Sequence, residues 1–128
     1  MNKPVGHILV KRVYAPPEAG DGQRVLVDRL WPRGLSKGEA HLDAWLKDVA
    51  PSPALRKWFG HDPTRFAKFT ERYRGELDAH PEALAPLLDL VRKGRVTLLY
   101  GAHDEVHNQA VVLADYLAEA GKGGDGRH

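Results

Sequence analysis

The chain has 128 residues, of which 42% are hydrophobic and 28% charged, a composition that fits one soluble globular domain. It contains no cysteine, which excludes disulfides, thiolate nucleophiles and cysteine-ligated zinc, and no apolar run approaches the roughly 20 residues that cross a bilayer. With a formal net charge of +2 and no signal-peptide pattern, the chain is expected to be cytoplasmic and away from membranes, and nucleic-acid binding is permitted but not indicated.

Two strands are expected in the first quarter of the chain. Residues Val5–Tyr14 alternate apolar and polar side chains and predict the first strand, which a turn-rich loop ends. Arg24–Asp28 is a compact β-branched run and predicts the second. Ser36–Glu39 fits a capping box, which indicates a short helical turn. Leu42–Val49 is assigned as a short extended segment, although its apolar residues have helical spacing.

Helices dominate the second half. Serine before Pro53 and aspartate before Pro63 are N-cap signals, so one helix is expected to end near Phe59 and a longer one to follow. That longer helix has an apolar stripe at spacings of three and four, made of Phe66, Phe69, Tyr73 and Leu77. A third helix is expected over Pro81–Arg92, where Gly94 ends it.

The last predicted elements define the fold class. A strand at Arg95–Tyr100 runs closely into a helix at Glu105–Ala120, which is half of a parallel βαβ crossover. We therefore expect a single α/β domain over residues 1–120, with a small, mainly parallel sheet flanked by helices. The glycine-rich residues 121–128 are expected to form a disordered tail.

The loop after the second strand is the first candidate for a binding site. Loops at strand ends in α/β domains are common binding sites, because they lie at the open edge of a rigid sheet. Arg29 and Arg33 each offer a planar fork of donors that matches phosphate or carboxylate. We therefore predict that this loop binds an anion and that Trp31 lines the site.

The loop after the last strand is the second candidate. If the two strands are parallel neighbours, both loops open onto one crevice, where Asp104 and His107 can supply general acid–base chemistry. Tyr100 and Asn108 are assigned as ligand-binding residues in the same crevice. Backbone N–H groups at the start of the last helix add a favourable dipole for a negative charge.

Most of these residues also have a structural interpretation. Asp104 fits an N-cap of the last helix, which does not exclude a ligand role. Asp28 and Arg29 can form a structural ion pair, Trp31 can be a core aromatic, and His107 can be structural. The sequence leaves these alternatives open.

A metal site is not assigned. His103 and His107 are four residues apart, but the first lacks the directly following glutamate of zinc proteases and no third ligand is evident. No cofactor motif is present either, so no cofactor is predicted.

The motifs resemble one known family, the YeaO-like family of uncharacterised proteins, DUF488. The resemblance rests on Val27–Gly34, Trp45–Ser52, Leu55–Pro63 and Thr97–Tyr100, with Asp104, His107, Asn108 and Ala110. It covers about Ile8 to Leu117 and implies a cytoplasmic, bacterial or archaeal α/β protein, but it supplies no activity. Longer relatives have a Cys-His-Arg string where this chain has Val106-His107-Asn108, so cysteine chemistry does not carry over.

Three functional hypotheses follow. The leading one is a domain that binds an anionic or phosphorylated small molecule, such as a nucleotide, with acid–base catalysis as an added possibility. The second is a module that binds nucleic acid or protein without catalysis, with phosphate contacts from Lys68, Arg72, Arg74 and Lys93. The third is a scaffold whose tryptophans form an interface. The oligomeric state is not predicted.

Overall fold

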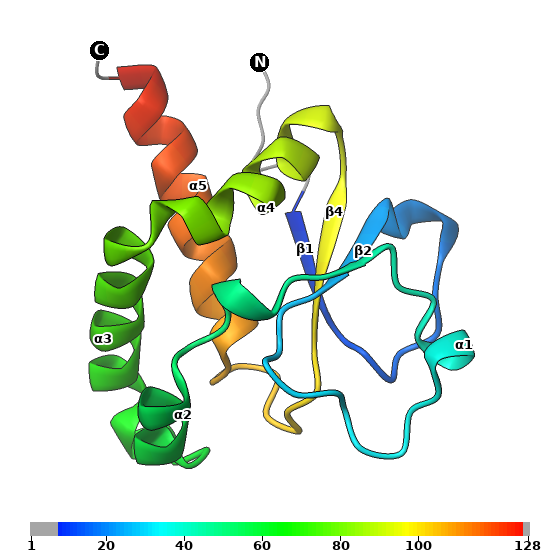
Figure 1. Ribbon diagram of the computed structural model, residues 1–128, viewed down its shortest axis with the longest axis horizontal. Coiled ribbons are helices and arrows are strands. Elements are labelled where there is room, and N and C mark those ends of the chain that lie inside the picture. The colour runs from blue at the N-terminus through cyan, green and yellow to red at the C-terminus, as the bar shows by residue number, and fades with distance from the viewer. Residues whose placement is uncertain (1–7, 127–128) are drawn as a thin grey trace.

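A parallel four-stranded sheet forms the centre of the computed structural model, which describes residues 8–126 (Figure 1). The strand order is β1-β4-β2-β3, and all three pairings are parallel. The strands are β1 (Ile8–Arg12), β2 (Gln23–Leu26), β3 (Ala44–Trp45) and β4 (Val96–Tyr100). The predicted α/β class with a parallel sheet is therefore confirmed, and the two strands that precede the candidate loops, β2 and β4, are direct neighbours.

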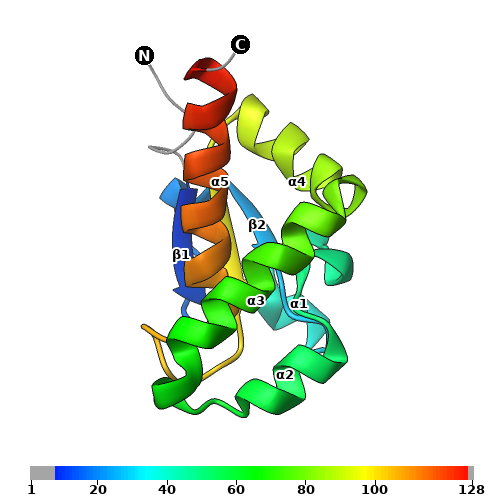
Figure 2. The ribbon, with the colours of Figure 1, turned by 90° about the vertical axis from the view of Figure 1, so that its left-hand side faces the viewer.

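The long helices lie together on one face of this sheet, as Figure 2 shows. There α5 contacts β1, β4 and α3, while α3 also contacts α2 and α4. The helices are α1 (Lys37–Ala40), α2 (Pro53–Phe59), α3 (Phe66–Ala79), α4 (Pro81–Lys93) and α5 (Gln109–Gly126), with 3₁₀ turns η2 (Ala19–Asp21), η3 (Lys47–Val49) and η4 (Pro63–Arg65). The opposite face is covered by loops and α1 rather than by long helices (Figure 1). No helix within residues 8–126 is long and apolar enough to cross a membrane.

Local capping explains where several helices begin and end. Ser36 and Glu39 form the predicted capping box of α1, each side chain accepting the other's backbone N–H at 3.1 Å. At α2 the Ser52 hydroxyl accepts the N–H of Leu55 at 3.2 Å, and Gly60 ends the helix in a left-handed conformation. These signals are local, which is why the sequence predicts them correctly.

Some predicted boundaries differ from the observed ones. The extended segment expected at Leu42–Val49 is reduced to β3 and the turn η3. The last helix begins at Gln109 rather than Glu105, and it continues through most of the expected tail to Gly126. Residues 1–7, which include the first three residues of the predicted strand Val5–Tyr14, and residues 127–128 of the tail lie outside the described residues.

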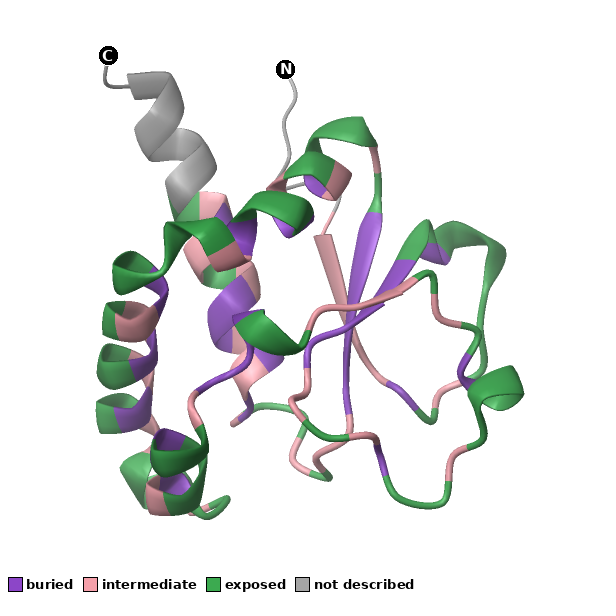
Figure 3. Cartoon of the chain, viewed as in Figure 1, coloured by how far each residue is buried: buried purple, intermediate pink, exposed green. Residues whose placement is uncertain are grey.

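The main core lies between the sheet and the helices, where Figure 3 shows buried residues along β2, β4 and the inner faces of α3 and α5. Aromatic rings fill the space next to α2, where Phe59 and Phe69 are stacked with centroids 4.3 Å apart. On the opposite face a smaller cluster joins Val13, Leu26 and Leu99 to partly buried tryptophans.

A buried ionic network fixes the loop-covered face. Asp21 is 1% exposed and receives the Lys11 ammonium at 2.5 Å and the Arg24 guanidinium at 2.6 Å. Arg24 also donates to the carbonyls of Ala40 and His41, each at 3.1 Å. Burial alone would raise the pKa of Asp21, but Lys11, the N–H of Glu18 and Arg24 together lower it to about 2. One carboxylate thus ties β1, β2 and α1 together.

Replacing Asp21 with Asn is expected to destabilise the protein by about 3 kcal/mol, because it leaves Lys11 and Arg24 without their buried anion. Because the pKa of Asp21 is lowered from 3.8 to about 2, its contribution is complete above pH 4 and lost as the pH falls toward 2. Urea unfolding at several pH values measures both effects. A loss below about 1 kcal/mol at neutral pH would contradict this role.

Candidate functional site

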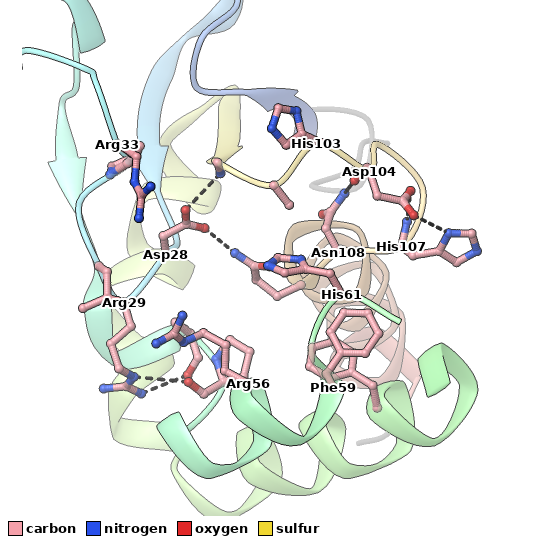
Figure 4. A pocket seen from close by; sticks show the side chains of 18 of the residues that line it. Asp28, Arg29, Arg33, Arg56, Phe59, His61, His103, Asp104, His107 and Asn108 are labelled. Carbon is pink, nitrogen blue, oxygen red and sulfur yellow. Dashed lines mark hydrogen bonds and ion pairs between the residues drawn. The ribbon is translucent and has the colours of Figure 1, made fainter. Parts of the chain in front are cut away.

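A cavity of about 750 Å³ opens where β2 and β4 end, and Figure 4 gives a close view of it. Both loops singled out in the sequence contribute to it, together with the chain around α2. Its lining residues are Tyr14, Asp28, Arg29, Leu30, Trp31, Pro32, Arg33, Ala50, Pro51, Arg56, Phe59, His61, Phe69, Gly101, Ala102, His103, Asp104, His107, Asn108 and Gln109. The parallel pairing of β2 with β4 brings the two loops together.

Asp28 occupies the floor of this cavity. One carboxylate oxygen accepts the N–H of Gly101 at 2.9 Å, and the other accepts the side-chain amide of Gln109. Burial raises the pKa of Asp28 to about 6, although these two donors and the nearby side chains of Arg56 and His61 act to lower it. Asp28 is therefore a carboxyl group that gains a proton close to the neutral range.

Arg29 does not pair with Asp28, so the ion pair considered from the sequence is not formed. Its guanidinium instead donates to the carbonyls of Ala50 and Pro51 at 3.1 and 3.2 Å, just before α2 begins. Arg29 thus lines the cavity while it holds the loop before α2 against the end of β2 (Figure 4).

Four exposed basic side chains surround Asp28: Arg33, Arg56, His61 and His103 (Figure 4). Among residues 8–126, neither arginine forms an ion pair with an acidic side chain. Sequence analysis identified Arg33 but missed Arg56 and His61. They follow a different strand, and no local signal indicates that α2 and the turn after it face the same cavity.

Asp104 and His107 are engaged with each other. One oxygen of Asp104 accepts the N–H groups of His107 and Val106, each at 2.9 Å, and the other meets Nδ1 of His107 at 2.9 Å. These bonds lower the pKa of Asp104 to about 2, which makes it a weak base near neutral pH. The His107 ring contacts Phe66 edge-on at 5.1 Å and is turned away from Asp28 and Arg33 (Figure 4).

Asn108, rather than Asp104, caps the last helix. Its side-chain oxygen accepts the N–H of Val111 at 3.1 Å, and its amide donates to the carbonyl of Asp104 at 2.9 Å. The N-cap expected at Asp104 is therefore wrong by four positions, since the chain makes an extra turn first. Asn108 is 1% exposed, so its bonds to the backbone fix the cavity wall.

The two aromatic candidates differ in position. Trp31 lines the cavity, with its indole N–H bonded to the carbonyl of Leu35 at 2.6 Å and its ring edge-on to Trp45 at 5.2 Å. Tyr100 lies opposite Arg12 in the β1–β4 register and lines a separate hollow. Tyr100 belongs to the main core and is not among the residues that line the cavity of Asp28.

No group of three or more histidine, aspartate or glutamate side chains within residues 8–126 could hold a metal ion. His103 and His107, the pair examined in the sequence, lie on opposite sides of Asp104 in Figure 4. The chemistry that this cavity offers is that of arginine, imidazole, amide and carboxyl groups.

Comparison with known proteins finds relatives over nearly the whole chain. A family described as the inactive DUF488-N3 subclade matches residues 7–127. The uncharacterized protein YeaO of Escherichia coli is 47% identical over 111 residues, which cover 87% of this chain and 96% of that relative. Uncharacterized proteins of Mycobacterium tuberculosis and Mycobacterium bovis are each 44% identical over 110 residues, which cover 86% of this chain and 92% of each relative. No solved structure matches.

Replacing Asp28 with Asn is expected to flatten the pH dependence of stability. Because folding raises the pKa of Asp28 from 3.8 to about 6, its contribution is complete below pH 4 and is lost as the pH rises through 6, a change of up to about 3 kcal/mol. Asparagine cannot titrate, and its amide can still accept from Gly101. Urea unfolding of the wild type and of Asp28→Asn from pH 4 to pH 7 measures how the free energy of unfolding changes with pH. The same pH dependence in both proteins would refute the raised pKa of Asp28.

A side chain at Gly101 is expected to destabilise the protein. A Cβ atom there would lie 2.9 Å from the Asp28 carboxylate and 3.5 Å from Pro32, so Gly101→Ala should destabilise the protein by about 1–3 kcal/mol. Gly75→Ala is the matched control, because nothing lies within 4 Å of its Cβ position in α3. Thermal unfolding should show a lower midpoint for the first variant only, and equal midpoints would contradict the close approach.

Proposed function

Because the chain belongs to the YeaO-like DUF488 family, whose matching subclade is described as inactive, we propose that it is a binding protein. Its cavity holds a phosphorylated or otherwise anionic small molecule without converting it. Nucleotides and sugar phosphates are the leading ligand classes, because each joins an anionic group to hydroxyl or amide groups.

The observation that carries this proposal is the pair of guanidinium groups that face the cavity without an acidic partner among the described residues. Arg33 and Arg56 face the cavity without an acidic partner among the described residues, and His61 adds an imidazole beside them. Clustered positive charge in a concave site attracts anions, and each guanidinium matches two oxygens of a phosphate group. A neutral or cationic ligand would leave these groups without a partner.

Asp28 adds a polar feature that a bare anion would not need. Its carboxyl group is held in place by Gly101 and Gln109, and its pKa of about 6 lets it accept or donate a hydrogen bond near neutral pH. A hydroxyl or amide group of the ligand is a suitable partner for it. Asp28 therefore favours a ligand that carries such groups next to its anion.

Catalysis is not part of this proposal. Asp104 is strongly acidic and His107 is turned away from the cavity floor, so neither is placed to exchange a proton with a ligand on Asp28. Asp28 has a pKa suited to proton transfer, yet no serine, threonine, cysteine or lysine is among the residues that line the cavity. The description of the subclade as inactive agrees with binding alone.

The alternative, a module that binds nucleic acid through Lys68, Arg72, Arg74 and Lys93, has less support. The three of these side chains on α3 have partners: Lys68 pairs with Glu71, Arg74 pairs with Glu119, and Arg72 lies over the ring of Trp58. Paired and stacked cations offer less to a phosphate backbone than free ones do. Steep salt-dependent DNA binding by the protein would favour this alternative.

A thermal-shift screen with nucleotides, sugar phosphates, sulfate and inorganic phosphate tests the proposal. A ligand at 100 times its dissociation constant stabilises the folded state by about 2.7 kcal/mol, which raises the midpoint by several degrees. The shift should disappear in Arg33→Ala and Arg56→Ala, because each removes one of the unpaired cations.

Arg92→Ala is the matched control. Arg92 lies at the end of α4, pairs with Asp89 at 3.2 Å and does not line the cavity, so its loss should leave the ligand shift unchanged. A screen without any shift, or a shift that all three variants lose equally, would count against an anion site in this cavity. Chemical conversion of a bound compound by the protein would refute the proposal that it binds its ligand without catalysis.

A further inference from the structure

Two histidines have a backbone conformation that is otherwise confined to glycine within residues 8–126. His41 has φ 49° and His61 has φ 58°, and every other positive φ belongs to a glycine. This left-handed region is strained for residues with a Cβ atom, although histidine enters it more often than most. Such a residue is held there by its surroundings, and strained residues of this kind cluster at functional sites.

The turn that contains His61 is fixed from both sides. Gly60, also left-handed, closes α2 by donating to the carbonyl of Arg56 at 3.1 Å, and Asp62 donates its N–H to the carbonyl of Phe59 at 3.0 Å. The Asp62 side chain then caps η4 by accepting the N–H of Thr64 at 3.0 Å. These bonds determine the conformation of His61 without any contribution from its side chain.

The imidazole of His61 therefore has no evident structural task. The residue is exposed, and its side chain makes no hydrogen bond or ion pair with any group of the described chain. The centroids of the His61 and Phe59 rings are 6.3 Å apart, and the ring planes make an angle of 49°. The His61 ring also lines the cavity whose floor is formed by Asp28. A glycine would fit the turn with less strain, but it would leave the cavity without this donor.

We propose that His61 is a ligand-binding residue, whose imidazole donates a hydrogen bond to the anionic group of the ligand beside Arg56. The inference rests on the proposed function, since it names a binding group of the same cavity. The imidazole has an N–H donor in both protonation states, so it serves a phosphate oxygen at any pH near neutrality. The strained turn holds that donor in place before the ligand arrives, which limits the ordering needed on binding.

His61→Gly tests the proposal, with His41→Gly as the matched control. Both substitutions remove a histidine from a left-handed position, but His41 follows α1 and is not among the residues that line the cavity. Inorganic phosphate is titrated into each protein and followed by heteronuclear NMR, and the thermal midpoint is measured without phosphate. We expect His61→Gly to weaken phosphate binding about tenfold, the loss of one hydrogen bond to a charged group. Its midpoint should stay equal or rise.

If His61→Gly binds phosphate as tightly as the wild type does, while Arg56→Ala no longer binds it, the role of His61 is overturned and the proposed function stays in place. Absence of phosphate binding by the wild type would overturn both. A lower midpoint in His61→Gly, with binding restored in His61→Asn, would assign His61 to the fold instead, because asparagine also tolerates the left-handed conformation. Weak binding by His61→Gly at an unchanged midpoint, with His41→Gly normal, supports the proposal.

Discussion

The carboxylate of Asp28 is the contact on which the candidate site depends. It lies two residues after β2 and accepts hydrogen bonds from the N–H of Gly101, just after β4, and from the side chain of Gln109, the first residue of α5. Two neighbouring strands and the helix that follows them are thereby joined at one point. A Cβ atom at Gly101 would lie 2.9 Å from this carboxylate, so a side chain there would have to displace it. The position of both loops, and so the shape of the cavity between them, follows from this junction.

The two faces of the sheet are stabilised in different ways. The long helices bury the main apolar core on one face, while Asp21, Lys11 and Arg24 hold the loops of the other face by buried charge. Since every pairing is parallel, all strands end at the same edge, and the segments that leave them meet there. The loop after β2 and the loop after β4 arrive from the sheet, and α2 arrives from the helical layer. The cavity forms where these three segments meet.

Local signals in the sequence are sufficient to predict most helices and strands. The site depends in addition on which segments pack beside one another in the fold. Ser36, Ser52 and the apolar stripe of α3 act within a few residues, so they could be interpreted correctly without the fold. Asp104 and Asn108 are both suitable caps, and only the extra turn between them decides in favour of Asn108. Tyr100 belongs to the main core, and because β4 is buried at every position, its sequence has no alternation that would indicate which face each side chain occupies. Arg56 and His61 reach the cavity because α2 packs beside the end of the sheet, and the sequence has no local signal for that packing.

The hydrogen bonds of the lining residues separate those that build the cavity from those left to bind. Arg29, Trp31 and Asn108 each donate to backbone carbonyls, and Asp104 pairs with His107. The single N–H donor of the Trp31 indole is thereby satisfied, whereas the Arg29 guanidinium is anchored by two of its five N–H donors. Arg33, Arg56 and His61 have no such partner among the described residues, and all three point positive charge or an N–H donor at one space. The residues that the sequence pattern made most conspicuous are thus largely the frame, and the less conspicuous ones provide the groups a ligand would meet.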